Sequence, residues 1–245
     1  MKVFYLNDLN NNAGDMISEP ILRWLGVDNI ELENRKYRGK LLAVGSIMSA
    51  LRRGDSVWGS GCIRHKQIIA PPNTTFIAIR GKKTKRMIRN AFVPNVFGDP
   101  ALLLPLIYNP VVEKKHKIGI LPHFIDKEIA RPIAEKENYH FIDIQTNWKS
   151  VIDEIKSCEK IISSTLHGII FSEAYNIPVV WAKYSDNIIG GEFKFQDYFS
   201  GTYRKEQSYF KELDKLENIK DIQKRLIDSF YIHFNFTGVE KKCII

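Results

Sequence analysis

The sequence predicts an α/β protein with two Rossmann-like domains that face each other across a cleft. Short apolar runs alternate with helical patterns along most of the 245 residues. The apolar runs are continuous, which is typical of parallel strands whose two faces are both covered by helices. Residues 106–117, which include Pro110 and a run of charges, divide this alternation into two series. We interpret this stretch as a linker between the two domains.

The N-terminal domain is assigned to residues 1–110. Its apolar runs predict buried strands, and periodic apolar positions between them predict helices. Near its end, Gly98-Asp99-Pro100 predicts a sharp turn in which Asp99 caps or orients a neighbour rather than acting as an acid. The strands are expected at 2–6, 41–45, 56–58 and 74–79, and the helices at 14–25, 46–51 and 82–91.

The C-terminal domain is assigned to residues 111–205, where strands and helices alternate regularly. Residues 193–199 are expected to form a short helix or a loop. The charged, amphipathic stretch 209–230 predicts a closing helix, so residues 206–245 are assigned to this helix and a C-terminal tail. The strands are expected at 117–121, 140–144, 160–163 and 178–182, and the helices at 126–137, 147–157 and 167–175.

Charge and cysteine usage narrow the class of protein. Lys and Arg number 36 against 28 Asp and Glu, and the net charge of +8 suits anionic ligands, nucleic acid or an anionic membrane surface. The basic residues are scattered in short clusters without aromatic platforms, so no nucleic-acid partner is expected. Three distant cysteines without a C-x-x-C pair indicate a reducing compartment and no zinc site. Without a signal-peptide pattern or an apolar run of about 18 residues, a cytoplasmic protein is expected.

Ligands of open parallel sheets collect at the carboxyl ends of the strands, beside helix N-termini. The turn Ser163-Ser164-Thr165-Leu166-His167-Gly168 lies at such a place. One of its three hydroxyls is expected to cap the following helix, and together they could also cradle a phosphate or a carboxylate. His167 would stand in the first helical turn, where it could transfer a proton or be a hydrogen-bonded structural residue.

Other strand-to-helix turns carry polar or glycine residues, each weak as a signal when taken alone. Asp15 is a candidate cap, Arg80 ends a strand and could bind a carboxylate or phosphate, and His123 ends a strand in the second domain. A structural role also remains open for each residue. Asp15 could belong to an ordinary polar loop, Arg80 could be a surface arginine, and His123 taken alone is weak evidence for a site. The turns concerned are 10–15, 42–46, 57–61, 79–81 and 120–123.

Together these turns resemble the polysaccharide pyruvyltransferase family, over roughly residues 5–200. The branch that decorates bacterial exopolysaccharides such as succinoglycan is the most similar. The matching pieces are Asn12-Ala13-Gly14-Asp15, Val44-Gly45-Ser46, Val57-Trp58-Gly59-Ser60-Gly61, Arg80-Gly81, Gly98-Asp99-Pro100-Ala101-Leu102-Leu103-Leu104-Pro105, Ile118-Gly119-Ile120-Leu121-Pro122-His123, Ser163-Ser164-Thr165-Leu166-His167-Gly168 with Ile177-Pro178-Val179-Val180, and Phe193-Lys194-Phe195-Gln196-Asp197-Tyr198-Phe199.

The resemblance implies a glycosyltransferase-B-like fold and a ketal pyruvyltransferase. Such an enzyme moves pyruvate from phosphoenolpyruvate onto two hydroxyls of one sugar during bacterial exopolysaccharide or capsule biosynthesis. The resemblance implies no metal and no cofactor, with phosphoenolpyruvate as the donor substrate. The implied acceptor is a sugar or a lipid-linked oligosaccharide. A lipid-linked acceptor would bring the protein to the inner face of the cytoplasmic membrane as a peripheral protein, where the charge of +8 would help.

The resemblance also implies roles for single residues. His167 is expected to act as the acid or base, or to grip the leaving phosphate, and Arg80 to bind the carboxylate or phosphate of the donor. Many family members carry an arginine where this chain has Thr165, so that cation is missing or comes from Lys183, Lys194 or Arg64. The expected substrate-binding residues are Ser163, Ser164, Thr165, His123, Lys194, Gly14, Asp15, Gly45, Ser46, Gly59 and Ser60.

Two other functions remain open on the sequence alone. A nucleotide-sugar-dependent glycosyltransferase of the same fold would bind a uridine or guanosine diphosphate, although no paired glutamates of the retaining type stand in the second domain. A non-catalytic binding or scaffold protein would keep the fold and tolerate the loss of His167 and Arg80.

Overall fold

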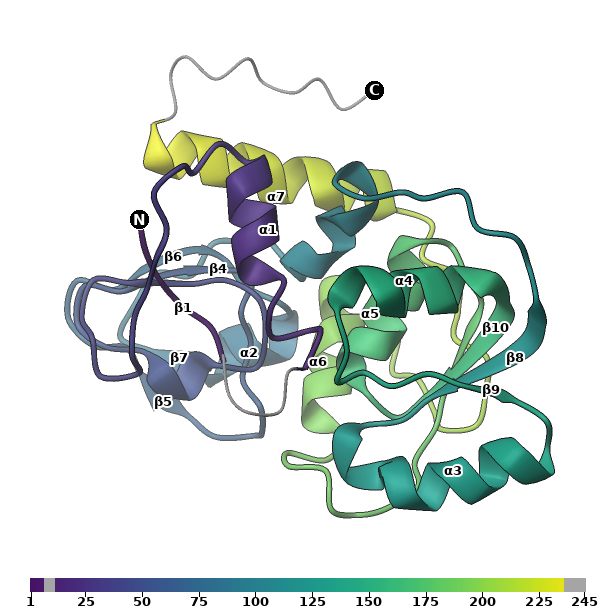
Figure 1. The fold of residues 1–245 in the computed structure, drawn as a ribbon. Coiled ribbons are helices and arrows are strands. Elements are labelled where there is room, and N and C mark those ends of the chain that lie inside the picture. Colours follow the sequence, from purple (N-terminus) through teal and green to yellow (C-terminus); the bar gives the residue numbers. More distant parts are fainter. Residues whose placement is uncertain (7–11, 236–245) are drawn as a thin grey trace.

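The computed structural model of the protein describes residues 1–6 and 12–235. It is an α/β structure built on parallel sheets, which confirms this part of the predicted fold class. A five-stranded sheet lies in the N-terminal half of the chain and a four-stranded sheet in the C-terminal half, side by side in Figure 1. A small two-stranded parallel sheet, β5 (Ile68–Ile69) with β7 (Ile88–Arg89), belongs to the N-terminal half.

The first sheet has the strand order β2-β1-β3-β4-β6, and all its neighbouring strands are parallel. Counted along the chain within this sheet, the order is a doubly wound one that reverses direction between β1 and β3. This reversal is a topological switch point, where the loops after the two strands diverge and leave a crevice. The strands are β1 (Lys2–Phe4), β2 (Glu31–Leu32), β3 (Leu41–Leu42), β4 (Ser56–Trp58) and β6 (Thr75–Ala78).

The second sheet has the order β11-β10-β8-β9 and is also parallel throughout. Counted along the chain within this sheet, the strand order is doubly wound as in the first sheet. The switch point lies between β8 and β10. Each sheet therefore offers one crevice at the carboxyl ends of its strands. The strands are β8 (His116–Leu121), β9 (His140–Phe141), β10 (Cys158–Ser163) and β11 (Val179–Trp181).

The helices follow the apolar periodicity of the sequence. In α4, for example, Val151, Ile152 and Ile155 are buried on one face, and the side chain of Asn147 accepts a hydrogen bond from Lys149 N and caps the helix. No helix in the described ranges is long and apolar enough to cross a membrane. The helices are α1 (Ser18–Trp24), α2 (Lys82–Met87), α3 (Lys127–Lys136), α4 (Trp148–Ser157), α5 (Leu166–Ala174), α6 (Phe193–Gly201) and α7 (Ile219–Phe234), with 3₁₀ turns at Met48–Ala50, Pro100–Leu106 and Phe124–Asp126.

Several predicted boundaries are wrong in the N-terminal half. The helix expected at 82–91 ends at Met87, because Ile88 and Arg89 pair with β5 instead. The helix expected at 14–25 begins only at Ser18 with Ile17 at its N-cap position, so Asp15 does not cap it. Residues 46–51 form a single 3₁₀ turn rather than a helix.

The end of the chain also differs from the prediction. The helix expected at 209–230 begins at Ile219, since the residues before it run along the edge strand β11. There Phe210 N donates to Trp181 O at 2.8 Å and Leu213 N to Val179 O at 2.9 Å. The cap predicted at Asp99 is confirmed, because its carboxylate accepts from Ala101 N at 3.0 Å.

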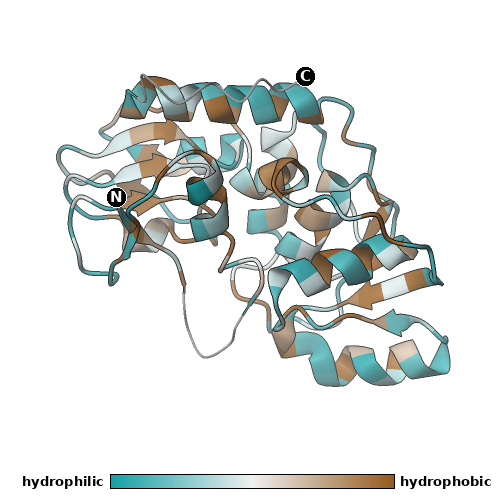
Figure 2. Ribbon diagram, turned by 45° about the horizontal axis from the view of Figure 1, so that its top comes forward, coloured by the Kyte–Doolittle hydropathy of each residue, from teal (hydrophilic) through white to brown (hydrophobic). Residues whose placement is uncertain are grey.

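Helix α7 returns from the second sheet to cover the core of the first half, as the yellow helix of Figure 1 shows. The indole of Trp58 donates to Leu226 O at 3.0 Å, and its ring packs on Phe230 with centroids 4.9 Å apart. Gln223 adds a hydrogen bond of 2.7 Å to Leu102 O. In Figure 2 hydrophobic and hydrophilic residues alternate along this helix, as expected of an amphipathic element that covers a core.

Helix α6 joins the two halves of the molecule. Phe195 and Phe199 pack on Trp181 of the second sheet, with ring centroids 4.8 and 5.5 Å away. The other side of α6 lies against the end of β6 and the start of α2. A Cβ atom at Gly201 would stand 2.0 Å from Arg80 O, so the two backbones touch without space for any side chain.

The substitution Gly201→Ala should therefore destabilise the whole protein. The added methyl group overlaps backbone rather than a flexible side chain, so we expect a loss of about 3 kcal/mol in the free energy of unfolding. Urea unfolding followed by tryptophan fluorescence measures this loss, and Ser208→Ala, on an exposed loop, is the control. An unchanged unfolding midpoint for Gly201→Ala would show that α6 and the turn after β6 are not in this tight contact.

Candidate active site between the two sheets

A pocket of about 210 Å³ lies where the switch points of the two sheets meet. The first sheet contributes residues from the turns after β1 and β3, and the second sheet contributes residues from the turns after β8 and β10. Helix α6 adds a residue from its first turn. Of the residues predicted from the sequence, the pocket brings together Asp15, Ser46, His123, Thr165, His167 and Lys194.

His167 is the second residue of α5, and its ring crosses to the first half of the molecule. A Cβ atom at Gly14 would stand 1.8 Å from His167 Nδ1, so only glycine leaves space for this ring. His167 Nε2 is shielded from solvent and has no hydrogen-bond partner among the described residues. Burial, with the nearby charges of Lys194 and Arg80, lowers the pKa of His167 to about 3. The imidazole is thus neutral at pH 7.

His123 stands opposite, in the turn after β8. Its Nδ1 accepts a hydrogen bond of 3.3 Å from Ile125 N and caps a short 3₁₀ turn. Burial and the charge of Lys194 lower the pKa of His123 to about 3. The two predicted histidines therefore face one pocket, and both are neutral while it is empty.

Lys194, the second residue of α6, brings a cation into the pocket, although the residue is only 7% exposed. Burial and the positive charge of Arg80 lower the pKa of Lys194 to about 8, against the opposing effect of Asp15 and Asp126. Lys194 thus stays mostly protonated at pH 7. Of the three cations considered in place of an arginine at position 165, it alone lines this pocket. Lys183 pairs with Asp186 at 2.5 Å, and Arg64 lines a different pocket.

The serine hydroxyls of the 163–165 turn are used within the protein. Ser163 Oγ donates to Leu121 O at 2.8 Å and accepts from Thr165 N at 3.2 Å. Ser164 Oγ donates to Asp126 at 2.9 Å and accepts from His123 N at 2.9 Å. These bonds hold the turns after β8 and β10 together. None of the three side chains caps α5, whose N-cap position is Thr165, and Thr165 alone of the three lines the pocket.

Arg80 is fully buried and does not line the pocket. Its guanidinium donates to Asp197 at 3.0 Å, to Ser46 Oγ at 2.6 Å and to Cys62 O at 2.7 Å. Arg80 therefore reaches the pocket only through Ser46, and its nitrogens are already satisfied.

The predicted glycine and serine positions after β3 and β4 also lie behind the lining. Ser60 Oγ donates to Gly45 O at 2.9 Å, which ties the two turns together. Gly59 lies against Pro100, where a Cβ atom would be 2.2 Å from the ring. Gly45, Gly59 and Ser60 thus lie behind Ser46 and support the turn from which Ser46 lines the pocket.

Three residues near the pocket were not singled out from the sequence. Asp197 binds Arg80, and Asp126 accepts hydrogen bonds from Ser164 and Ser185. Asn12 lines the pocket, and its side chain accepts from Gly14 N at 3.0 Å. The sequence could have pointed to Asp197 and Asn12, because both lie inside stretches that resemble the family. For Asp126 the only indication in the sequence is its place after a predicted strand.

The arrangement can bind an anion and move protons. A desolvated ammonium attracts negative charge strongly, and two neutral imidazoles beside it can accept protons. No group of three or more His, Cys, Asp or Glu side chains in residues 1–6 and 12–235 is placed to hold a metal ion.

Comparisons with known proteins agree with the motifs. A model of the family described as polysaccharide pyruvyl transferase matches residues 12–187. The chain is 30% identical over 211 residues to an uncharacterized protein, L143, of Acanthamoeba polyphaga mimivirus, covering 80% of this chain and 72% of that protein. No solved structure matches the chain significantly. The match spans well over half of the sequence and contains every residue that lines the pocket except Leu6, Ile189 and Lys194, so the chain belongs to the polysaccharide pyruvyl transferase family.

Proposed function

We propose that the protein transfers the pyruvyl group of phosphoenolpyruvate to two hydroxyls of one sugar, forming a cyclic ketal. Family membership supports this reaction class. The observation that carries the proposal is the meeting of Lys194 and His167 in one pocket at the switch points of both sheets. Two doubly wound sheets around such a pocket also fit the glycosyltransferase-B-like arrangement that we propose for the whole fold.

The reaction needs an anion site and proton carriers. Phosphoenolpyruvate bears a carboxylate and a phosphate on C2, and a proton added to C3 makes C2 electrophilic. One sugar hydroxyl then bonds to C2, the phosphate leaves with the C–O bonding electrons, and the second hydroxyl closes the ring. The two hydroxyls lose two protons, and these balance the proton gained by C3 and the proton carried away by the phosphate.

Lys194 has a pKa suited to an acid near neutral pH, and His167 offers a neutral imidazole as a base. The ammonium of Lys194, with its pKa lowered to about 8 by burial, can bind the donor and deliver a proton near neutral pH. His167, whose pKa burial lowers to about 3, is neutral without a ligand, and the negative charges of a bound donor would raise this pKa and make the imidazole a stronger base for a sugar hydroxyl. We therefore assign the acid role to Lys194 and the base role to His167. His123 is assigned to the binding of the donor.

Arg80 is assigned a positioning role instead of direct contact with the donor. Its bond to Ser46 fixes a pocket wall, and its charge adds to the positive field that an anionic donor meets. The narrower assignment to exopolysaccharide or capsule biosynthesis, and a sugar or lipid-linked oligosaccharide as acceptor, rests on the resemblance of the motifs alone.

Calorimetric titration with phosphoenolpyruvate tests the proposal directly. Binding, followed by release of inorganic phosphate in a screen of pyranosides, is the expected result. Titration with uridine diphosphate and guanosine diphosphate runs in parallel. Binding of a nucleoside diphosphate without any binding of phosphoenolpyruvate would overturn the proposal in favour of glycosyl transfer.

The substitution Lys194→Met should weaken phosphoenolpyruvate binding by about 10- to 100-fold. Methionine fills a similar volume but removes a charge-assisted contact worth about 1.5–3 kcal/mol. Calorimetry measures the change, and Lys183→Met, which removes a nearby exposed lysine, is the control. Equal affinities for wild type and Lys194→Met would remove Lys194 from the donor site.

Binding of phosphoenolpyruvate should also weaken as the pH rises above about 8. The anions of the donor raise the pKa of Lys194 on binding, so the complex holds this proton more tightly than the empty pocket does. The affinity for phosphoenolpyruvate is therefore highest and constant below the pKa of Lys194 in the ligand-free protein. Above this pKa the affinity falls by up to about tenfold per pH unit. Lys194→Met should bind with a constant, weaker affinity over the same range, and a parallel decline in both proteins would contradict this origin.

The substitution His167→Gln should lower kcat by about 10²- to 10⁴-fold, which is the usual contribution of a general base. The affinity for phosphoenolpyruvate should change little, because the neutral imidazole carries no charge to attract the donor. Phosphate release with an accepted sugar measures kcat, and His65→Gln, an exposed histidine outside the pocket, is the control. Retained turnover in His167→Gln would assign the base to another group.

A further inference from the structure

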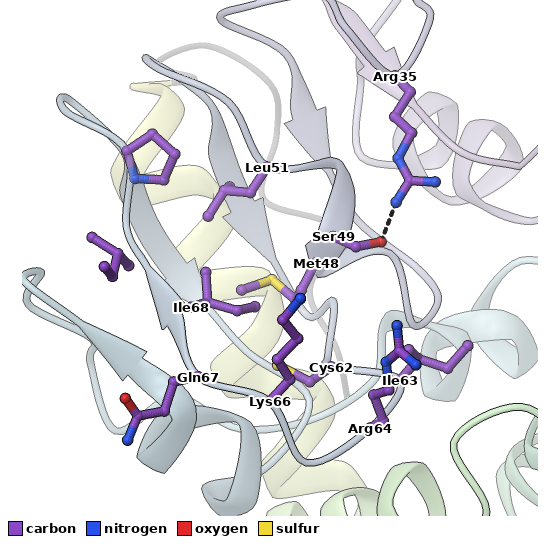
Figure 3. A pocket seen from close by; sticks show the side chains of 12 residues that line it. Arg35, Met48, Ser49, Leu51, Cys62, Ile63, Arg64, Lys66, Gln67 and Ile68 are labelled. Carbon is purple, nitrogen blue, oxygen red and sulfur yellow. Dashed lines mark hydrogen bonds between the residues drawn. The ribbon is translucent and has the colours of Figure 1, made fainter.

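A second pocket, of about 340 Å³, lies in the N-terminal half, and nothing in the proposed reaction uses it. Its floor is apolar: Met48, Leu51 and Cys62 are buried beneath it, and Ile68 and Pro71 continue it. Its rim carries the exposed cations Arg35, Arg64 and Lys66. In Figure 3 Met48 and Ile68 lie in the middle of the pocket with Lys66 beside Met48, whereas Arg35 and Arg64 lie toward the right.

No acidic residue of the described ranges 1–6 and 12–235 neutralises the positive charge of the rim. None of them lines the pocket. Arg35 donates to Ser49 Oγ, the contact drawn in Figure 3, and none of the three cations forms an ion pair with a described residue. Three like charges around one hollow repel each other, and an anion placed between them would relieve this repulsion.

The floor sets a second requirement on the ligand. Hydrocarbon placed over Met48, Leu51 and Ile68 is removed from water at a gain of about 25 cal/mol per Å². The described lining contains no aromatic ring on which a base could stack, so a nucleic-acid base has no platform there. A group that is anionic at one end and apolar at the other satisfies both rim and floor. Phosphate and carboxylate both match the fork of an arginine guanidinium, and a phosphate ester, with a charge of about −1.5 to −2, suits three cations better than a singly charged carboxylate does.

The pocket adjoins the candidate active site. Ile63 lines both pockets. At this point the two halves touch, because a Cβ atom at Gly190 would be 1.9 Å from Ile63 O. A molecule held by the rim therefore lies beside the central pocket, with Ile63 as the shared wall.

We propose that this pocket binds an organic phosphate ester whose next group is apolar. The phosphate lies between Arg64, Lys66 and Arg35, and the hydrocarbon lies on the floor formed by Met48, Leu51 and Ile68. This site is separate from the donor site, so its occupant and phosphoenolpyruvate bind together.

Calorimetry with three probes tests the site: octyl phosphate, methyl phosphate and octyl glucoside, each below its micelle concentration. Octyl phosphate should bind at least about tenfold more tightly than either of the others, because methyl phosphate lacks the floor contact and octyl glucoside lacks the charge. Octyl phosphate that fails to bind, or that binds no better than octyl glucoside, would overturn the proposal.

The double substitution Arg64→Gln with Lys66→Gln should weaken octyl phosphate binding by about tenfold or more, since it removes two charge-assisted contacts. Its control is Arg86→Gln with Lys117→Gln, which removes two exposed charges outside the pocket. Equal weakening in both double variants would indicate net charge rather than a site. Unfolding midpoints of both should match wild type.

Phosphoenolpyruvate titrated into the complex with octyl phosphate separates the two sites. Unchanged phosphoenolpyruvate affinity supports them as separate, whereas displacement of octyl phosphate would place it in the central pocket and overturn the inference. Octyl phosphate binding without any phosphoenolpyruvate binding would leave this site standing while removing the proposed function.

Co-sedimentation with phosphatidylcholine vesicles, with and without phosphatidic acid, identifies the source of the ester. Sedimentation only with phosphatidic acid, lost in the Arg64→Gln with Lys66→Gln variant, assigns the site to a lipid in a bilayer. Binding of octyl phosphate without sedimentation assigns it to a free molecule.

Discussion

The ion pair between Arg80 and Asp197 fixes the relation between the two halves of the protein. Both side chains are fully buried, so the cost of removing two charges from water must be offset by good geometry and further hydrogen bonds. Asp197 also accepts from the backbone and the hydroxyl of Thr84, at 2.6 and 2.7 Å, while Arg80 also binds Ser46 and Cys62 O. One buried network thus joins β6, α2 and α6 to the pocket wall, and the lining from both halves depends on it.

The electrostatic state of the central pocket follows from its burial. Desolvation and the charge of Lys194 lower the pKa of both His123 and His167, and Arg80 adds to the effect on His167, so both imidazoles are neutral. The anionic donor that we propose would reverse this balance, since its charges favour protonated neighbours. In the proposed reaction, the two imidazoles would then gain proton affinity only when the donor is present, which would couple proton transfer to donor binding.

The sequence predicted local structure well, but it did not predict which residues far apart in the chain contact each other. Continuous apolar runs predicted parallel strands, and the polar turns after them predicted the place of the pocket, because both depend on neighbouring residues. The strand order, with its two switch points, depends on pairings that no local pattern encodes. Ser163 and Ser164 were predicted as anion ligands from residue type, but Leu121 O and Asp126 engage their hydroxyls. Arg80 was predicted to bind the donor, but its guanidinium forms an ion pair with Asp197, which lies 117 residues later in the sequence.

Trp58 meets Leu226 across 168 residues, and this separation shapes how the protein folds during synthesis. The ribosome releases the first sheet early, but α7, which covers the core beside Trp58, leaves it only after both sheets. The second sheet and its helices are contiguous in the chain, from β8 to α6, so they can complete their core before the first half does. The half made first therefore matures last. Until α7 arrives, the Trp58 face of this half is exposed, and apolar surface exposed in this way during synthesis is prone to aggregation.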